Sequence, residues 1–145
     1  MPSGNSVAML NLLRLGKVTG NTALEEKAAR VGRAFSKTIW QAPRAYTQMM
    51  SALDFALGPT SEVVIAGDAG AEDTKAMLAV LRKVFIPGKV MVLRPGNNSE
   101  VIGLAEYTRN LTSIEGKATA YVCRNYSCKL PATDAGEMLD LLKEK

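Results

Sequence analysis

Residues 118–134 read ATAYVCRNYSCKLPATD and hold both cysteines of the chain. The first six residues form an apolar run that ends at Cys123, a pattern typical of a buried strand. A polar turn over residues 124–127 follows, and Asp134 is a helix start signal. The stretch therefore predicts a strand, a loop and a helix in succession, as in α/β proteins.

The same alternation extends back along the chain to residue 59. Short apolar runs predict strands at 62–67, 89–94 and 118–123. A helix opening at Asp73, with Phe85 facing inward, separates the first two, and a weaker helix over 99–108 follows the second. Apolar strands that alternate with helices favour a parallel, helix-covered sheet. Residues 59–145 are therefore expected to form a small three-stranded parallel α/β unit with right-handed crossovers.

Residues 1–58 have helical periodicity instead. Asn5 or Ser6 can cap a first helix, a capping box over 22–25 opens a second, and Pro43 suits the first turn of a third. Apolar residues of the second helix recur at helical spacing: Leu24, Ala28, Val31, Phe35 and Ile39. The predicted fold class is thus mixed α/β, with a three-helix segment before the α/β unit.

Composition and charge exclude several classes of protein. The 145 residues carry a net charge of +4, and the excess of positive charge lies in residues 1–60. Its basic helical face lacks interleaved aromatic residues and any recognition motif, which argues against nucleic-acid binding. No apolar run approaches the roughly 20 residues of a membrane span. The first residues lack the features of a secretory signal, so a cytoplasmic location is expected.

The chain contains no histidine. This removes the usual general base, the Ser-His and Cys-His pairs and the commonest metal ligand. Two cysteines cannot build a closed zinc site alone. We therefore expect no resident metal and no cofactor, and no catalytic residue is predicted.

The cysteines are separated by four residues, unlike the two of thioredoxin-like redox sites. A turn after Cys123 could bring Cys128 back beside it, and this spacing permits a disulfide. Three interpretations stay open: two reduced thiols, a redox-responsive pair, or half of a metal site completed by another chain.

Polar residues also follow the predicted strands. If the strands are parallel, Asp68, Arg94 and Arg124 lie on one rim of the sheet, where ligands of open α/β folds bind. Since Asp68 would repel an anion that Arg94 attracts, we expect a docking surface there before a small-molecule site.

Segments along the whole chain resemble one family: PSGNSVA at 2–8, NLLRL at 11–15, VVIAGD at 63–68 with DTK at 73–75, IPGKV at 86–90, and ATAYVC at 118–123 with Cys128, Pro131, Thr133 and Asp134. In order and spacing they resemble the C-terminal end of the spermatogenesis-associated protein 20-like family, also called the YyaL family or DUF255 thioredoxin-domain proteins.

This resemblance implies an N-terminal thioredoxin-like domain and an α/α toroid, similar to six-hairpin glycosidases and N-acylglucosamine 2-epimerases, upstream of the segment. Residues 1–58 would be the last toroid helices. Their expected partners are those upstream regions, or a second copy bound through an apolar face around Leu10, Leu13, Met49 and Met50.

The expected function is a C-terminal structural and interaction portion with no catalytic activity in isolation. One alternative is a part of a carbohydrate-active, epimerase- or glycosidase-like enzyme. Asn5 and Ser6 would then contact ligand in the toroid interior, whereas otherwise they merely cap a helix. The other alternative is a thiol redox module using Cys123 and Cys128.

Overall fold

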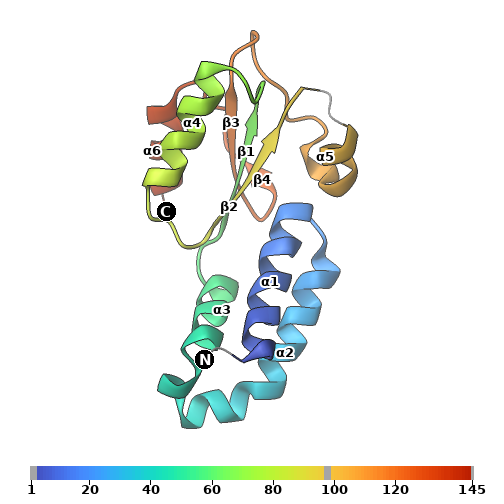
Figure 1. Cartoon of the computed structure of the whole chain (residues 1–145), viewed down its shortest axis with the longest axis vertical. Coiled ribbons are helices and arrows are strands. Elements are labelled where there is room, and N and C mark those ends of the chain that lie inside the picture. Colours follow the sequence, from blue (N-terminus) through green and yellow to red (C-terminus); the bar gives the residue numbers. More distant parts are fainter. Residues whose placement is uncertain (1–2, 97–98, 145) are drawn as a thin grey trace. The chain divides into compact units, whose positions relative to one another are not determined.

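The computed structural model describes residues 3–96 and 99–144. The chain divides into two compact units, residues 1–60 and 61–145. The first unit is helical and the second is built around a sheet (Figure 1). Within the described residues, no helix is both long and apolar enough to cross a membrane.

The helical unit contains α1 (Gly4–Thr19), α2 (Thr22–Gln41), the short 3-10 turn η1 (Pro43–Tyr46) and α3 (Thr47–Leu57). The three predicted helices are confirmed, but their caps differ from the prediction by one to three residues. Ser3 caps α1 by accepting the Ser6 N–H at 3.2 Å, and Asn21 caps α2 by accepting the Ala23 N–H at 3.1 Å. Both caps have extended backbone immediately before the first helical turn, as a capping side chain requires.

The core of this unit lies where α1 packs against α2 and α3. Its buried members include Met9, Leu13, Ala28, Met49 and Ala52. The apolar face expected around Leu10, Leu13, Met49 and Met50 is therefore not a surface. Only Met50 is exposed, because the turn at η1 folds α3 back so that Met49 and its neighbours face α1.

The second unit contains four strands and three helices among its described residues. They are β1 (Ser61–Ala66), α4 (Glu72–Lys83), β2 (Lys89–Arg94), α5 (Ser99–Leu104), the 3-10 turn η2 (Glu106–Thr108), β3 (Thr119–Arg124), β4 (Ser127–Cys128) and α6 (Ala135–Lys143). The strand order in the sheet is β2-β1-β3-β4.

The sheet is mixed, so the prediction of three parallel strands is wrong. β1 and β2 are parallel, but β3 runs antiparallel to β1 and forms a hairpin with β4. The helix within the connection is short. The six residues of α5 rise only about 9 Å, whereas a six-residue strand such as β2 spans roughly 20 Å. The chain is not carried back along the sheet, so it enters β3 from the end at which β2 stops.

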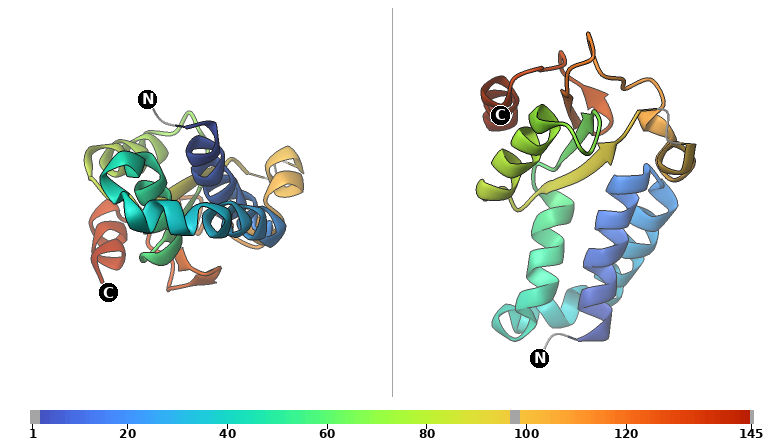
Figure 2. Two further views of the ribbon diagram at one scale, coloured as in Figure 1. Left: turned by 90° about the horizontal axis from the view of Figure 1, so that it is seen from below. Right: turned by 45° about the horizontal axis from the view of Figure 1, so that its top comes forward.

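One face of this sheet holds the apolar core. Val63 and Ile65 of β1 and Val122 of β3 pack under α4 and α6, against residues such as Met77 and Met138. These two helices lie on one side of the sheet and α5 on the other (Figure 2). Phe85, expected to face inward, is 91% exposed, because α4 ends at Lys83 and the backbone becomes extended at the next residue.

The opposite face of the sheet, which we call the polar face, carries Glu62, Arg94, Thr119, Tyr121 and Cys123 among the apolar side chains of Val64, Ala66, Val90 and Val92. The segment from α5 to β3 covers it. One Nη of Arg94 donates to the carbonyl of Arg109 at 3.0 Å, and the Tyr121 hydroxyl donates to the carbonyl of Thr112 at 2.6 Å. The two faces of one sheet thus have different chemistry, and the second contains the candidate site.

Asp73 joins α4 to the start of β3. One carboxylate oxygen accepts the N–H of Ala118 at 2.7 Å, and the other accepts the N–H of Thr74 at 2.8 Å. These hydrogen bonds, with Ala118 the larger contributor, hold the pKa of Asp73 below its ordinary value of 3.8. A lowered carboxyl pKa stabilises the fold above the unfolded pKa, and this contribution is lost as pH falls through the folded pKa.

We therefore expect Asp73→Asn to lower the free energy of unfolding at pH 7. The difference from wild type should shrink below about pH 4, where both side chains become neutral. Urea unfolding at pH 7 and pH 3 measures this change. Glu72→Gln, in the same helical turn and paired with the exposed Lys75, is the matched control. A wild-type advantage over Asp73→Asn that stays constant between the two pH values would contradict the assignment.

Candidate functional site

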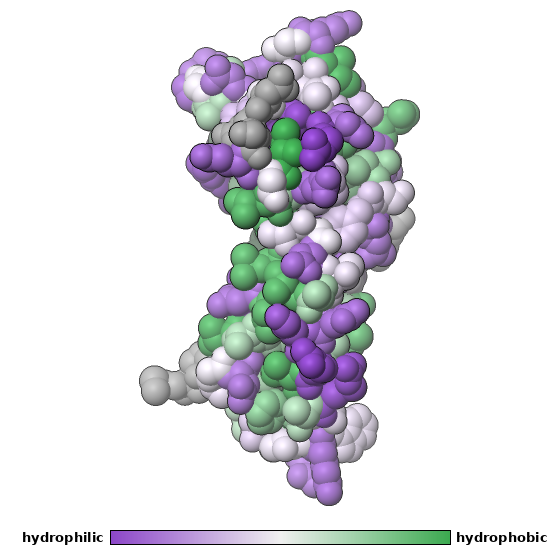
Figure 3. Space-filling model, turned by 90° about the vertical axis from the view of Figure 1, so that its right-hand side faces the viewer, coloured by the Kyte–Doolittle hydropathy of each residue, from purple (hydrophilic) through white to green (hydrophobic). Residues whose placement is uncertain are grey.

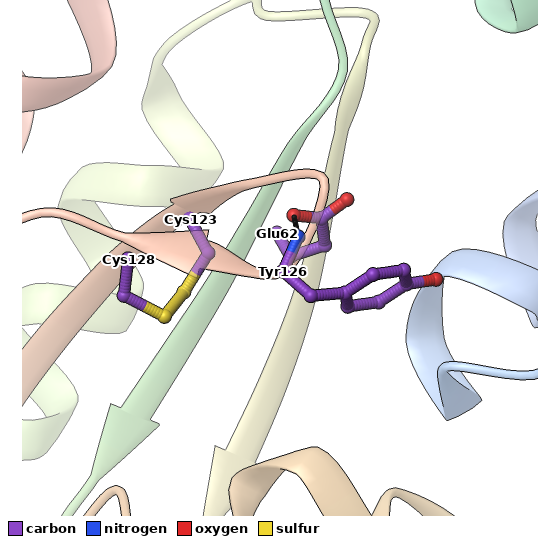
Figure 4. Close-up of a disulfide and its surroundings, with 4 residues drawn as sticks. All are labelled: Glu62, Cys123, Tyr126 and Cys128. Atoms are coloured by element: carbon purple, nitrogen blue, oxygen red, sulfur yellow. Dashed lines mark hydrogen bonds between the residues drawn. A yellow bond between two sulfur atoms is a disulfide. The ribbon is translucent and has the colours of Figure 1, made fainter.

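The two cysteines lie directly opposite each other in the β3–β4 hairpin and form a disulfide (Figure 4). Their Cα atoms are 3.8 Å apart. The neighbouring pair is hydrogen-bonded, with the Lys129 N–H donating to the Val122 carbonyl at 3.0 Å. Cys123 and Cys128 are therefore a non-hydrogen-bonded pair, in which facing residues come closest together. The structure forms the intramolecular bridge that the spacing permits.

Only two residues, Asn125 and Tyr126, link the two strands. Their φ angles are 50° and 61°, both in the left-handed region. This is the backbone of a type I′ hairpin turn, in which asparagine suits the first position and glycine is preferred at the second. A tyrosine at the second position costs about 1 kcal/mol or more of backbone energy. Other contacts must offset this cost.

The contacts of Tyr126 include a hydrogen bond and a ring contact. Its backbone N–H donates to a carboxylate oxygen of Glu62 at 3.3 Å. Its ring lies edge-to-face against Tyr107, with ring centroids 5.3 Å apart, a geometry that contributes about 0.5–1.5 kcal/mol beyond area burial. Figure 4 shows the Tyr126 ring pointing away from the disulfide, with its backbone nitrogen beside the Glu62 carboxylate.

The turn, the bridge and the acidic side chain form one group, which we call the hairpin cluster: Glu62, Tyr107, Cys123, Tyr126 and Cys128. Glu62 is fully buried and faces Cys123 directly across the β1–β3 ladder. Burial, with a smaller contribution from the charge of Glu62, raises the pKa of Tyr107 to about 12. The buried Tyr107 hydroxyl makes no hydrogen bond to a described residue. The cluster thus combines a disulfide, a carboxylate and a neutral phenol.

The predicted rim of Asp68, Arg94 and Arg124 does not exist. Arg124 ends β3 next to Cys123, the partner of Glu62 near the start of β1, whereas Arg94 pairs with Ala66 at the other end. The antiparallel direction of β3 is the cause. Arg124 instead donates to the carbonyl of Glu144, and Arg94 is buried.

Gly67 and Asp68 have structural roles in the described fold. A Cβ on Gly67 would lie 2.5 Å from the Thr74 hydroxyl oxygen, so the close approach of β1 and α4 requires glycine. The Asp68 carboxylate accepts the Gly70 N–H at 2.7 Å and shapes the turn into α4.

Asn5 and Ser6 were predicted to contact ligand. Ser6 is buried, and its hydroxyl donates to the Ser3 carbonyl at 2.7 Å. It lines a mostly polar pocket of about 380 Å³ with Ser3, Ala45, Tyr46, Thr47, Gln48 and Met49. Asn5 is exposed and is not among the lining residues. Ligand contact by Ser6 stays a prediction.

A second pocket of the helical unit is apolar. This groove of about 560 Å³ lies between α2 and α3 and is lined by Gly32, Ser36, Ile39, Trp40, Pro43, Met50 and Leu53. Trp40 is 87% exposed. On the face of the helical unit turned toward the viewer in Figure 3, apolar side chains reach the surface between charged ones. In the part of the chain that the structure describes, no group of His, Cys, Asp and Glu could hold a metal ion.

The chain is 38% identical to spermatogenesis-associated protein 20 of Homo sapiens over 142 residues, which are 97% of this chain and 18% of the human protein. It is 36% identical to the same protein of Rattus norvegicus over 144 residues, 99% of this chain and 18% of that relative. The chain is homologous to spermatogenesis-associated protein 20. This confirms the resemblance seen in the sequence motifs.

The chain spans about a fifth of the length of these relatives. No protein-family profile matches it, and no solved structure matches it. The homology therefore relates the chain to a segment of a longer protein. The role of that segment is inferred below from the structure.

Three members of the hairpin cluster, Glu62, Tyr107 and Tyr126, were not predicted as site residues. Glu62 and Val64 are two residues apart, so they lie on the same face of the strand. The sequence therefore could have shown that an acidic side chain lies on a buried face. The Asn-led two-residue link between Arg124 and Ser127 was a hairpin signal. Nothing in the local sequence places Tyr107 against them, because η2 approaches the sheet only in the tertiary fold.

We expect Tyr107→Phe to raise the free energy of unfolding by about 1 kcal/mol, because it keeps the ring and removes a buried hydroxyl without a partner. Tyr121→Phe is the matched comparison. It should lower stability by about 1 kcal/mol through loss of the hydrogen bond to Thr112. Urea unfolding followed by circular dichroism measures both. Equal destabilisation by the two variants would show that the Tyr107 hydroxyl has a partner after all.

Proposed function

We propose that this chain is the structural and docking portion of a longer protein, the C-terminal part of a thioredoxin-domain plus α/α-toroid protein. Catalysis by the chain alone is not part of this function. The apolar groove between α2 and α3 is the observation that carries the proposal. The extra length of the homologous relatives supports it, because it supplies a source of helices to cover the groove.

The lining of the groove suits a helix. On α2, Gly32, Ser36 and Ile39 recur at helical spacing, so one face of the helix is presented. Two of these residues are small, which allows a partner backbone to come close. Met50 on α3 adds an adaptable apolar side chain. An amphipathic helix laid into such a groove is a common recognition mode. We propose that a toroid helix of the same longer protein occupies the groove.

The test mixes this chain with human spermatogenesis-associated protein 20 from which the matched segment is deleted. We expect binding that buries Trp40 and shifts its fluorescence to shorter wavelength. Trp40→Ala should weaken binding by about tenfold or more, as expected for a central aromatic anchor. Leu130→Ala, which removes an exposed apolar residue of the second unit, is the control and should change nothing.

Absence of binding, or equal binding by Trp40→Ala, would contradict the proposal. Sedimentation of the chain alone as a dimer that Trp40→Ala dissociates would also contradict it, because the occupant would then be a second copy.

A second candidate function is favoured by the polar pocket of the helical unit. Hydroxyl and amide groups of Ser3, Ser6, Thr47 and Gln48, beside the ring of Tyr46, suit the hydroxyls and the apolar face of a sugar ring. The chain would then contribute one wall of a carbohydrate-active site, in an epimerase- or glycosidase-like enzyme.

For this candidate we expect saturation-transfer NMR to detect weak binding of N-acetylglucosamine, with a Kd on the order of 1 mM or above, since one wall buries little of the ligand. Gln48→Ala should abolish the signal. Asn5→Ala, which alters a neighbouring residue outside the lining, should keep it. No transfer to the sugar from the wild-type chain would remove the candidate.

A further inference from the structure

We infer that the Cys123–Cys128 bridge is a thiol–disulfide exchange site, attacked at Cys128 by a dithiol reductant, and that its opening releases the Tyr126 turn. This inference is independent of the docking and sugar-binding functions proposed above. It selects one of the interpretations that the spacing of the cysteines left open.

The two ends of the bridge differ in access. Cys123 is fully buried in β3, whereas Cys128 is exposed on β4, a two-residue strand at the edge of the sheet. A thiolate attacks along the disulfide axis and needs an open path to the sulfur. The attacked atom is therefore the sulfur of Cys128.

The exchange has two steps. The attacking thiolate forms a bond to the Cys128 sulfur, the bridge breaks, and its electron pair goes to the Cys123 sulfur, which takes a proton from solvent. The second thiolate of the reductant then attacks its own bound sulfur and displaces Cys128, which is protonated in turn. The chain gains two electrons and two protons, and the reductant leaves as a disulfide.

The short loop that this bridge closes contributes little to its stability against reduction. It closes a loop of only four intervening residues, so it removes less conformational entropy from the unfolded chain than a longer loop would. Besides the bridge, the Lys129 N–H bond to Val122 and the Lys129 ammonium, 2.5 Å from a carboxylate oxygen of Glu144, hold the returning strand beside the turn. Farther along, Ala132 and Ala120 exchange two backbone hydrogen bonds.

Opening the bridge changes the turn. The disulfide holds the facing Cα atoms at 3.8 Å, closer than the roughly 4.5 Å of an ordinary non-hydrogen-bonded pair. Once the strands separate, nothing covalent holds Tyr126 at a φ of 61°, which tyrosine rarely adopts. Its return to the extended region withdraws the N–H from Glu62 and the ring from Tyr107. The reduced chain would then present Glu62 and the phenol of Tyr107.

A matched pair of variants tests the attack. Cys123→Ser leaves the exposed Cys128 as the single thiol, and Cys128→Ser leaves the buried Cys123. We expect Ellman's reagent to react at least about tenfold faster with Cys128, because access limits thiol reactivity. With oxidised glutathione, Cys123→Ser should give the mixed disulfide by mass spectrometry. Equal rates, or faster reaction of Cys123, would overturn the assignment.

The conformational step is tested on the wild-type chain, which avoids variants that fail to fold. Dithiothreitol at pH 7 should reduce the bridge without loss of the far-ultraviolet circular dichroism of the helices. Trypsin should then cleave after Arg124 or Lys129 at least about tenfold faster than in the oxidised chain, because cleavage follows local opening. Cleavage after Lys37, in the helical unit, should be unchanged. A bridge that dithiothreitol opens only in urea would overturn the exchange site, and unchanged cleavage after reduction would overturn the release of the turn.

Discussion

The antiparallel pairing of β3 with β1 positions four groups of the hairpin cluster, namely Glu62, Cys123, Tyr126 and Cys128. It places Cys123 opposite Glu62, directs the chain into the turn at Asn125 and Tyr126, and brings Cys128 back to the sheet edge. At the other end of β3, the Asp73 carboxylate holds the N–H of Ala118. The strand is therefore fastened at its start by a charge-assisted hydrogen bond and at its end by a covalent bridge.

The two faces of the sheet have different roles. Its apolar face packs under α4 and α6 and supplies the core. Its polar face carries a buried glutamate and a buried arginine, Glu62 and Arg94, under a segment with little regular structure. Buried polar groups cost free energy unless they are satisfied. Their presence on one face, next to a disulfide with one exposed end, is why that face is the better place to look for function.

The helical unit raises a different question. Its core is closed, yet an apolar groove remains between α2 and α3, with Trp40 beside it in water. The chain is homologous to a segment of a protein about five times longer, and we propose that a helix of that longer protein occupies the groove. Docking and thiol exchange involve separate residues, so one chain can serve both.

The amino-acid sequence by itself determined the three helices, the strands near 62–67, 89–94 and 118–123, the Asp134 cap and the relation to spermatogenesis-associated protein 20. These depend on local periodicity, caps and motif spacing. It did not determine strand direction, because a strand covered on both faces reads as an apolar run whether it is parallel or antiparallel. Only the tertiary structure decided that Arg124 lies away from Asp68 and that Glu62, Tyr107 and Tyr126 meet. The pairing of β3 with β1 and the approach of η2 to the sheet decided it, and both act between residues far apart in the chain.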